Sequence, residues 1–167
     1  MEPTDRRLRP PAAHDHAADT TDAAALRDAA EILARAQADE AAADEARTRY
    51  RGQAMTSLDP DVRIAPLLAP GETVLAMRHS AMVDRRQPAT GAGALAGLGG
   101  DLYLTSRRLV LVGRHTLSFD LDEIEEVMLA GERLLLVLRD GRGASLDVDR
   151  PRLLRVELAV ARATARA

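Results

Sequence analysis

Short runs of apolar residues separated by turn residues follow one another from residue 73 to residue 148. Residues 116–121 alternate between apolar and polar side chains, as in a strand with one buried face. Residues 133–139 are almost continuously apolar, which is typical of a central strand, and Asp140-Gly141 then predicts a hairpin turn. We therefore predict strands at 74–83 (one long strand or two short ones), 102–105, 109–112, 116–121, 126–130, 133–139 and 144–148.

The last part of the chain has the period of a helix. Pro151 suits the first helical turn, with Asp149 or Arg150 near the cap. One broad side of this helix is apolar, through Leu153, Leu154, Val156, Leu158 and Val160, and the other carries Arg152, Arg155, Arg162 and Arg166. Glu157 falls within the apolar arc, so if it is buried it needs an arginine or a backbone donor nearby.

An alanine-rich segment at residues 22–52 predicts a second helix, because alanine has the highest helix propensity. Its apolar face is thin. Leu26 and Leu33 have heptad spacing, but the next two positions of that series are Glu40 and Arg47, which a strong coiled coil would not place there. Two interpretations stay open: a solvated or loosely docked helix, and a helix for weak self-association or partner docking.

The remaining segments differ in composition from these elements. Residues 1–21 are rich in Pro, Asp and Ala without periodicity, and we predict a disordered tail. Residues 53–72 are predicted to be a linker in which Asp59 starts a short helical turn, packed on the domain by Ile64, Leu67 and Leu68. The compact domain is then predicted to cover residues 73–167.

The run Gly100-Asp-Leu-Tyr-Leu-Thr-Ser-Arg-Arg-Leu-Val-Leu-Val-Gly113 resembles the core motif of bacterial PH-like and GRAM-like domains. Leu121-Asp122-Glu123-Ile124 and the preceding Pro70-Gly-Glu-Thr-Val-Leu75 are similar to two further elements of that family. The resemblance covers residues 58–167. It implies a mainly β fold with about seven antiparallel strands in two near-orthogonal sheets, capped by a C-terminal helix. Such motifs specify fold better than function.

Composition narrows the function classes. A net charge of −3 gives no global positive field for nucleic acid, and an aromatic content of 2% is too low for base-stacking platforms. The absence of cysteine excludes disulfides and thiolate metal sites. The N-terminus does not read as a secretory signal, and no apolar run approaches the roughly 18–20 residues of a membrane span. We expect a cytoplasmic protein, with the inner membrane face as an alternative location.

Four arginines at predicted strand ends form the candidate anion or membrane site, and we call Arg85, Arg86, Arg107 and Arg108 the arginine rim. Lipid-binding PH domains carry basic residues on the first two strands and the loop between them, and the resemblance maps Arg85 and Arg86 there. Asp101 lies at a position where lipid binding would require a further basic residue. The alternative is that these are ordinary surface arginines, with the stem of Arg108 packed on the barrel and its head paired with an acid.

The other residues that could form a catalytic or binding site do not predict one. The glycine-rich segment 89–100 reads as a mobile loop between strands, because a dinucleotide turn would need a preceding strand and a following helix. The acidic residues within 120–126 lack the glycine turn of a calcium loop, which favours a solvated strand end or partner electrostatics. None of the histidines can be placed in a triad or a metal site: His14, His16, His79 and His115.

The sequence thus favours a non-enzymatic interaction module that binds a protein partner through a sheet edge, the 86–100 loop or the closing helix. Peripheral binding to an anionic membrane through the arginine rim is the alternative, and a small-ligand binder or enzyme at the barrel mouth is the remote one. We expect no cofactor and no nucleic-acid partner. Self-association through residues 22–52 is a second role left open.

Overall fold

The structure, a computed structural model, describes the backbone of residues 16–86 and 95–166 and the side chains of residues 24–84 and 97–166. The chain forms two units, residues 1–35 and 36–167. Helix α1 (His16–Arg49) begins before the predicted Asp22 and belongs to both units. Within the first unit its large apolar side chains are mostly exposed, namely Leu26, Ile32 and Leu33. Residues 1–15 of the predicted tail lie outside the described residues.

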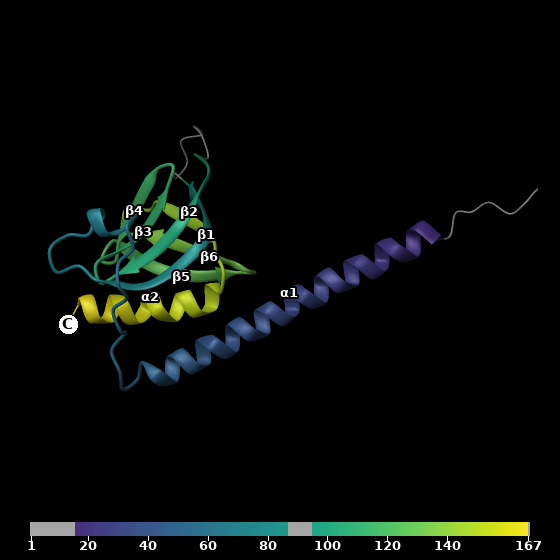
Figure 1. Cartoon of the computed structure of the whole chain (residues 1–167), viewed down its shortest axis with the longest axis horizontal. Helices are drawn as coiled ribbons and strands as arrows, with labels where there is room; N and C mark the ends of the chain where they lie inside the picture. Colours follow the sequence, from purple (N-terminus) through teal and green to yellow (C-terminus); the bar gives the residue numbers. More distant parts are fainter. Residues whose placement is uncertain (1–15, 87–94, 167) are drawn as a thin grey trace, which may run out of the picture. The chain divides into compact units, whose positions relative to one another are not determined.

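The second unit is built on a seven-stranded antiparallel sheet followed by a helix (Figure 1). The strand order is β4-β3-β2-β1-β7-β6-β5. The elements are β1 (Val74–Arg86), β2 (Leu95–Thr105), β3 (Arg108–Gly113), β4 (Thr116–Asp120), β5 (Ile124–Ala130), β6 (Arg133–Leu138), β7 (Gly143–Asp147) and α2 (Pro151–Ala165). The predicted mainly β fold of about seven antiparallel strands with a closing C-terminal helix is confirmed, and hydrogen bonds join all seven described strands into one sheet.

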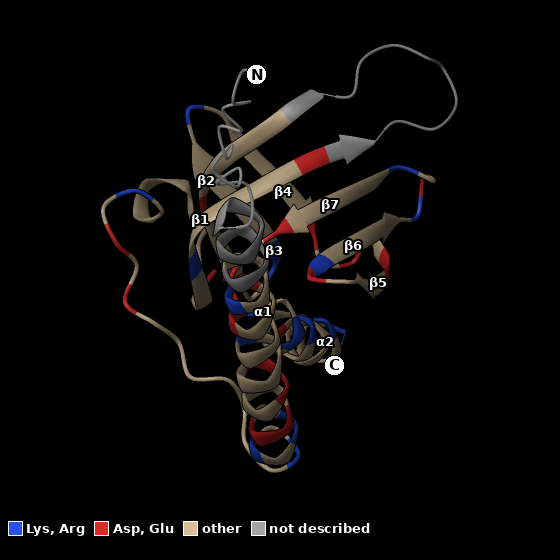
Figure 2. Ribbon diagram, turned by 90° about the vertical axis from the view of Figure 1, so that its right-hand side faces the viewer, with Lys and Arg blue, Asp and Glu red and all other residues tan. Residues whose placement is uncertain are grey.

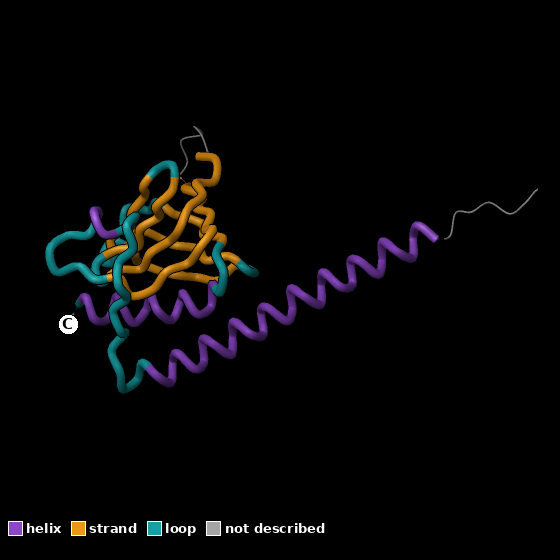
Figure 3. The backbone as a smooth tube through the Cα atoms, in the orientation of Figure 1, coloured by secondary structure: helices purple, strands orange, loops and turns teal. Residues whose placement is uncertain are grey.

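Strand β1 is one long strand with a bend, rather than two short strands. Its register with β2 shifts between Arg78 and Ala81, and Ser80 has a positive φ of 54°, which is uncommon for a residue other than glycine. Asp101 of β2 accepts a hydrogen bond from the Ser80 N–H at 3.4 Å. Beyond this bulge β1 also pairs with β7, so the bend lets one strand serve both halves of the curled sheet (Figure 3).

The main core lies between the concave face of the sheet and α2. It includes Leu102, Leu104, Leu109, Leu111, Ile124, Leu134, Leu136 and Leu146 from the strands, and Leu154, Leu158 and Ala161 from the helix. Burying a leucine side chain stabilises the fold by about 1.5–3 kcal/mol before entropy is subtracted. Burial of the apolar side of α2 therefore holds this helix on the sheet.

The convex face of β1–β3 is covered by the segment predicted to be a linker. Ile64 is fully buried against Tyr103 and Val110. The Tyr103 hydroxyl donates to Asp61 Oδ2 at 2.7 Å. The other oxygen of Asp61 accepts the backbone N–H of Ile64 at 3.1 Å, so Asp61, rather than Asp59, organises the turn. This segment is part of the packed domain.

A short 3-10 helix, η1 (Ala65–Leu67), stands where the helical turn was predicted. Leu68 is partly buried against the second core cluster, as expected. Leu67 is 37% exposed, so the prediction that it packs on the domain is wrong for this side chain.

The second part of α1, from Ala36 onward, packs on α2. Ala43 and Ala46 are buried against Val156, with Tyr50 and Leu153 at the edge of the same cluster. Small side chains on α1 let the two helices approach closely. The question whether this helix docks on the barrel is thereby answered for residues 36–49.

Candidate functional site

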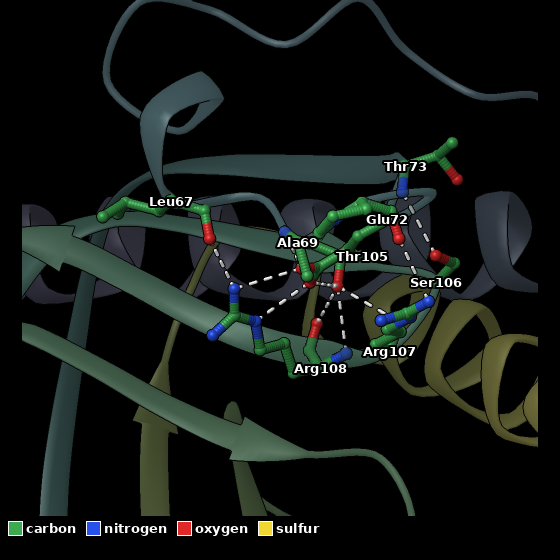
Figure 4. A network of polar contacts seen from close by, with 9 residues as sticks. Leu67, Ala69, Glu72, Thr73, Thr105, Ser106, Arg107 and Arg108 are labelled. Atoms are coloured by element: carbon green, nitrogen blue, oxygen red, sulfur yellow. Dashed lines mark hydrogen bonds and ion pairs between the residues drawn. The ribbon is translucent and has the colours of Figure 1, made fainter.

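The turn between β2 and β3 carries half of the arginine rim, and a buried carboxylate organises it (Figure 4). The Glu72 side chain is fully buried, and Arg108 Nε donates to its Oε1 at 2.9 Å. Thr105 Oγ1 donates to the same oxygen at 2.6 Å. Arg108 Nη2 donates to the Leu67 carbonyl at 2.6 Å. Arg108 is thus paired with an acid, as one of the sequence interpretations predicted.

The protonation of this pair follows from its surroundings. Burial alone would raise the pKa of Glu72, but hydrogen bonds from Arg108, Thr105 and the Ala69 N–H outweigh it, so the pKa lies below its usual value. The hydrogen bond to Glu72 raises the pKa of Arg108. Both groups are therefore charged at neutral pH, and Arg108 has a structural partner.

The arginine rim is not one surface. Val74 of β1 pairs with Thr105, next to the Arg107–Arg108 turn, whereas Arg85 pairs with Leu95 at the other end of the same two strands. Between these two pairs β2 runs from Leu95 to Thr105, a strand of 11 residues with a contour of about 33 Å. This corrects the expectation of a shared rim: strand register puts the two arginine pairs at opposite ends of β1 and β2.

The individual rim residues also differ. The backbones of Arg85 and Arg86 lie in β1, but their side chains lie outside the described residues. Arg107 is at the opposite end, where its Nη2 donates to the Pro70 carbonyl at 3.2 Å. A membrane site made of all four arginines is not what the strand register provides.

The predicted arginine face of α2, whose basic positions are blue in the ribbon of Figure 2, also divides into arginines with a partner and arginines without one among the described residues. Arg152 donates to the two carboxylate oxygens of Glu132 at 3.0 and 2.9 Å. It also lies 3.7 Å from Asp39 and 3.3 Å from Glu40. The hydrogen bond with Glu132 raises the pKa of Arg152. Arg152 therefore ties α1, α2 and the β5–β6 turn together.

Arg162 has a structural role at the start of β5. Its Nη2 donates to the carbonyls of Ile124 and Glu125, and its buried Nε has no hydrogen-bond partner. Burial lowers the pKa of Arg162, and the nearby charges of Arg166 and Arg139 lower it further. Of the predicted face, only Arg155 and Arg166 are fully exposed.

Glu157 is buried, as the helical wheel indicated, and it has the donor that burial demands. Arg78 Nη2 donates to Glu157 Oε2 at 2.6 Å, and both side chains are about 90% buried. Burial raises the pKa of Glu157, although the charge and the hydrogen bond of Arg78 oppose this shift. This confirms the prediction that an arginine pairs with Glu157.

Arg150 is the N-cap residue of α2, in line with the prediction of Asp149 or Arg150 near the cap, but the side chain that caps the helix comes from a distant residue that was not predicted. Arg150 precedes the helix in a left-handed conformation and makes no side-chain cap. Instead Asp39 of α1 accepts the backbone N–H of Arg152 at 2.8 Å and that of Leu153 at 3.0 Å. A carboxylate at this position satisfies donors that a helix leaves free and favours the positive end of its dipole.

The sheet has two unpaired edges, β4 and β5, each bonded to one neighbour only. On β5 the side chains of Glu125, Glu126 and Met128 are exposed. The rest of the predicted acidic cluster is exposed too, at Asp120, Asp122 and Glu123. Among the side chains that the structure describes, no group of acids and histidines is arranged to hold a metal ion.

The remaining candidates lie apart from one another. His79 Nδ1 is 3.3 Å from Asp101 at the β1 bulge, and His115 is exposed between β3 and β4. His14 and residues 89–94 of the predicted glycine-rich loop lie outside the described residues, whereas residues 95–100, also predicted to be loop, belong to β2, where they pair with β1. Within the part of the chain that is described, neither helix is both long enough and apolar enough to span a membrane.

Two hollows are formed by described side chains. One, of about 560 Å³, lies between α1 and α2 and is lined by Arg47, Tyr50, Arg51, Arg155, Val156, Ala159 and Val160. The other, of about 310 Å³, is lined by Ala54, Met55, Thr73, Leu75, Ser106, Ala161, Thr164 and Ala165. The first combines cationic and apolar groups, whereas the second has no charged side chain in its lining.

Solved structures similar to this chain include PH domains. The N-terminal PH domain of Vps36 is 18% identical, with 65% of this chain and 91% of that domain covered and a TM-score of 0.46. The PH domain of USP37 is 18% identical, with 52% and 95% covered and a TM-score of 0.38. The C-terminal domain of an unknown protein from Leishmania infantum is 15% identical, with 60% and 92% covered and a TM-score of 0.47.

No family model matches this chain, and no curated protein sequence matches it. At these identities the solved structures describe a distant likeness in fold. Function must therefore be argued from the side chains and edges of this protein. The bacterial and GRAM-like part of the resemblance stays a prediction.

Proposed function

We propose that this protein is a non-enzymatic interaction module of PH-like fold, and that it binds an extended, basic segment of a protein partner along the free edge of β5. The observation that carries this proposal is the unpaired edge itself. Among the described strands β5 (Ile124–Ala130) pairs only with β6, and because Arg162 occupies the carbonyls of Ile124 and Glu125, the free part of this edge is Glu126–Ala130. A free edge presents backbone N–H and C=O groups to which another strand can add.

The charges along this edge indicate what kind of segment it suits. Glu125 and Glu126 are exposed on the strand, Glu123 precedes it and Glu132 follows in the β5–β6 turn. Glu132 is engaged by Arg152, whereas Glu125 and Glu126 make no ion pair with any described residue. The exposed Met128 adds an apolar contact between the charged ends. Complementary charge favours a partner strand that alternates arginine or lysine with apolar residues.

β5 suits this role better than β4. Beyond the Arg162 contact, residues 126–130 of β5 form a free stretch as long as β4, but β5 exposes a glutamate and an apolar side chain, Glu126 and Met128, whereas β4 exposes Thr116, Ser118 and Asp120. The arginine rim was the basis for the membrane alternative, and its two halves lie at opposite ends of β1 and β2. A protein partner therefore stands ahead of a membrane as the ligand of this fold.

The test uses the full chain and a synthetic peptide of about eight residues that alternates Arg and Val, a typical strand length. We expect the peptide to slow hydrogen exchange of β5 amides but not of β4 amides. We expect E125Q/E126Q to weaken binding and D120N, an equally exposed change at the β4 edge, to leave it unchanged. Protection of β4, equal binding of a Glu-Val peptide, or no binding at all would overturn the proposal.

A further inference from the structure

The hollow between α1 and α2 has features of a ligand site that the β5 edge does not share. We call it the helix groove, and it is formed by Arg47, Tyr50, Arg51, Arg155, Val156, Ala159 and Val160. Its volume of about 560 Å³ falls within the roughly 300–1,000 Å³ typical of small-molecule sites. All of its residues belong to one unit of the chain.

The two walls of the helix groove are held in place by contacts already described. Asp39 caps α2 from α1 at 2.8 and 3.0 Å, and Ala43 and Ala46 pack directly on Val156. These contacts lie along the same pair of helices as the groove. The groove is therefore a fixed feature of the fold, since separating its walls would break the two hydrogen bonds to Asp39 and the packing of Ala43 and Ala46 on Val156.

The floor of the groove is apolar. Val156 is 8% exposed, Val160 and Tyr50 are partly exposed, and Ala159 is exposed. These side chains offer a hydrocarbon surface along one side of α2. An alkyl chain lying there would remove apolar area from water on both sides, which stabilises a complex by about 25 cal/mol per Å² of area buried.

Three arginines and no carboxylate line the groove. Arg47 is engaged by Glu40 at 3.1 Å and by Asp44 on its own helix. Arg51 and Arg155 are exposed and make no hydrogen bond or ion pair with the residues that the structure describes. Two free guanidinium groups beside an apolar floor are complementary to an anion that carries a hydrocarbon chain.

We infer that the helix groove binds a monomeric anionic amphiphile, a long-chain carboxylate, with its head group between Arg51 and Arg155 and its chain along Val156 and Val160. A bilayer surface fits less well, because the larger apolar side chains of α2 are buried or only partly exposed and its exposed residues are Arg155, Ala159, Ala163, Thr164 and Ala165. This site is separate from the β5 edge and does not depend on the function proposed for it.

The test is calorimetric titration of the full chain with dodecanoate below its critical micelle concentration. We expect saturable binding that R51Q/R155Q weakens by about tenfold or more, since each substitution removes a charge-assisted contact. R114Q is the matched control, because Arg114 is also exposed and without a described partner. We also expect dodecanoate to shift the amide NMR signals of Val156 and Val160.

Three further probes decide the nature of the ligand. Dodecyltrimethylammonium has the same chain and the opposite charge, and inorganic phosphate has charge without a chain; we expect neither to bind measurably. Vesicles of anionic phospholipid should bind no better than neutral ones. The inference is overturned if dodecanoate does not bind, if R114Q weakens binding as much as R51Q/R155Q does, or if anionic vesicles or an acidic peptide bind more tightly than dodecanoate.

Discussion

Replacing Asp39 by Ala tests whether α1 is an integral part of the domain. The Asp39 side chain is buried and accepts the backbone N–H groups of Arg152 and Leu153. Removing a helix cap costs about 1–2 kcal/mol, and partial burial of the two donors that lose their acceptors adds about 1 kcal/mol. Alanine regains roughly 0.5 kcal/mol through its helix propensity. We therefore expect D39A to lower the free energy of unfolding by about 2 kcal/mol.

The measurement is urea unfolding of the full chain, followed by circular dichroism and by tyrosine fluorescence so that coincident transitions verify two-state behaviour. D44A is the matched control. Asp44 is an exposed aspartate on the same helix whose partner is the exposed Arg47, so the small loss of that pair and the gain in propensity nearly cancel. D39N should fall between the two, because its amide nitrogen cannot accept a hydrogen bond. If D39A is no less stable than D44A, the cap does not stabilise α2 and the reasoning fails.

Two charged pairs inside the domain give opposite responses to pH. Because the pKa of Glu72 is lowered in the folded state, its contribution to stability is present above its unfolded pKa of about 4.3 and is lost as the pH falls through the lower folded value. E72Q should therefore flatten the loss of stability below about pH 4.5 in acid titrations monitored by circular dichroism. An unchanged profile would contradict this. Arg78→Leu leaves the Glu157 carboxylate buried without its partner, so we expect a loss of about 3–5 kcal/mol at pH 7. The pKa of Glu157 is raised in the folded state, and R78L should raise it further, so acidification toward pH 5 should restore part of the lost free energy of unfolding. The double variant R78L/E157L should lose less stability than R78L. Equal losses of stability at both pH values would show that the carboxylate is not the cause.

Features that depend on neighbouring residues were predictable from the sequence. The strands of the β2–β3 and β6–β7 hairpins, the alternation in β4 and the Pro151 start of α2 follow from spacing and turn residues a few positions apart. The sequence also indicated that Glu157 requires a partner such as an arginine, because a buried carboxylate within an apolar helix face must be paired. Which arginine supplies it, Arg78, depends on how β1 runs beneath the helix.

Features that depend on distant residues were not predictable. Asp39 and Arg152 are 113 positions apart, and nothing in either local pattern marks a cap. The packing of Ile64 on the domain was predicted, but its partner Tyr103 was not, because the prolines around Ile64 read as a linker. The error in the arginine rim was avoidable, because the connection before β2 and the turn after it must lie at opposite ends of that antiparallel strand, which separates Arg85 and Arg86 from Arg107 and Arg108.

The contacts of α1 also decide which part of the chain can be called the domain. The PH-like resemblance begins at residue 58, and a fragment beginning there would lack Asp39, Ala43 and Ala46. The first turn of α2 would then lose both of its backbone acceptors, and Leu153 and Val156 would lose their cover. The helix groove would lose one of its two walls. A fragment that retains the β5 edge but lacks α1 should therefore bind the basic peptide if α2 remains packed on the sheet. The same fragment should not bind dodecanoate. The two proposed sites thus differ in their dependence on α1, and that difference separates the failure of one from the failure of the other.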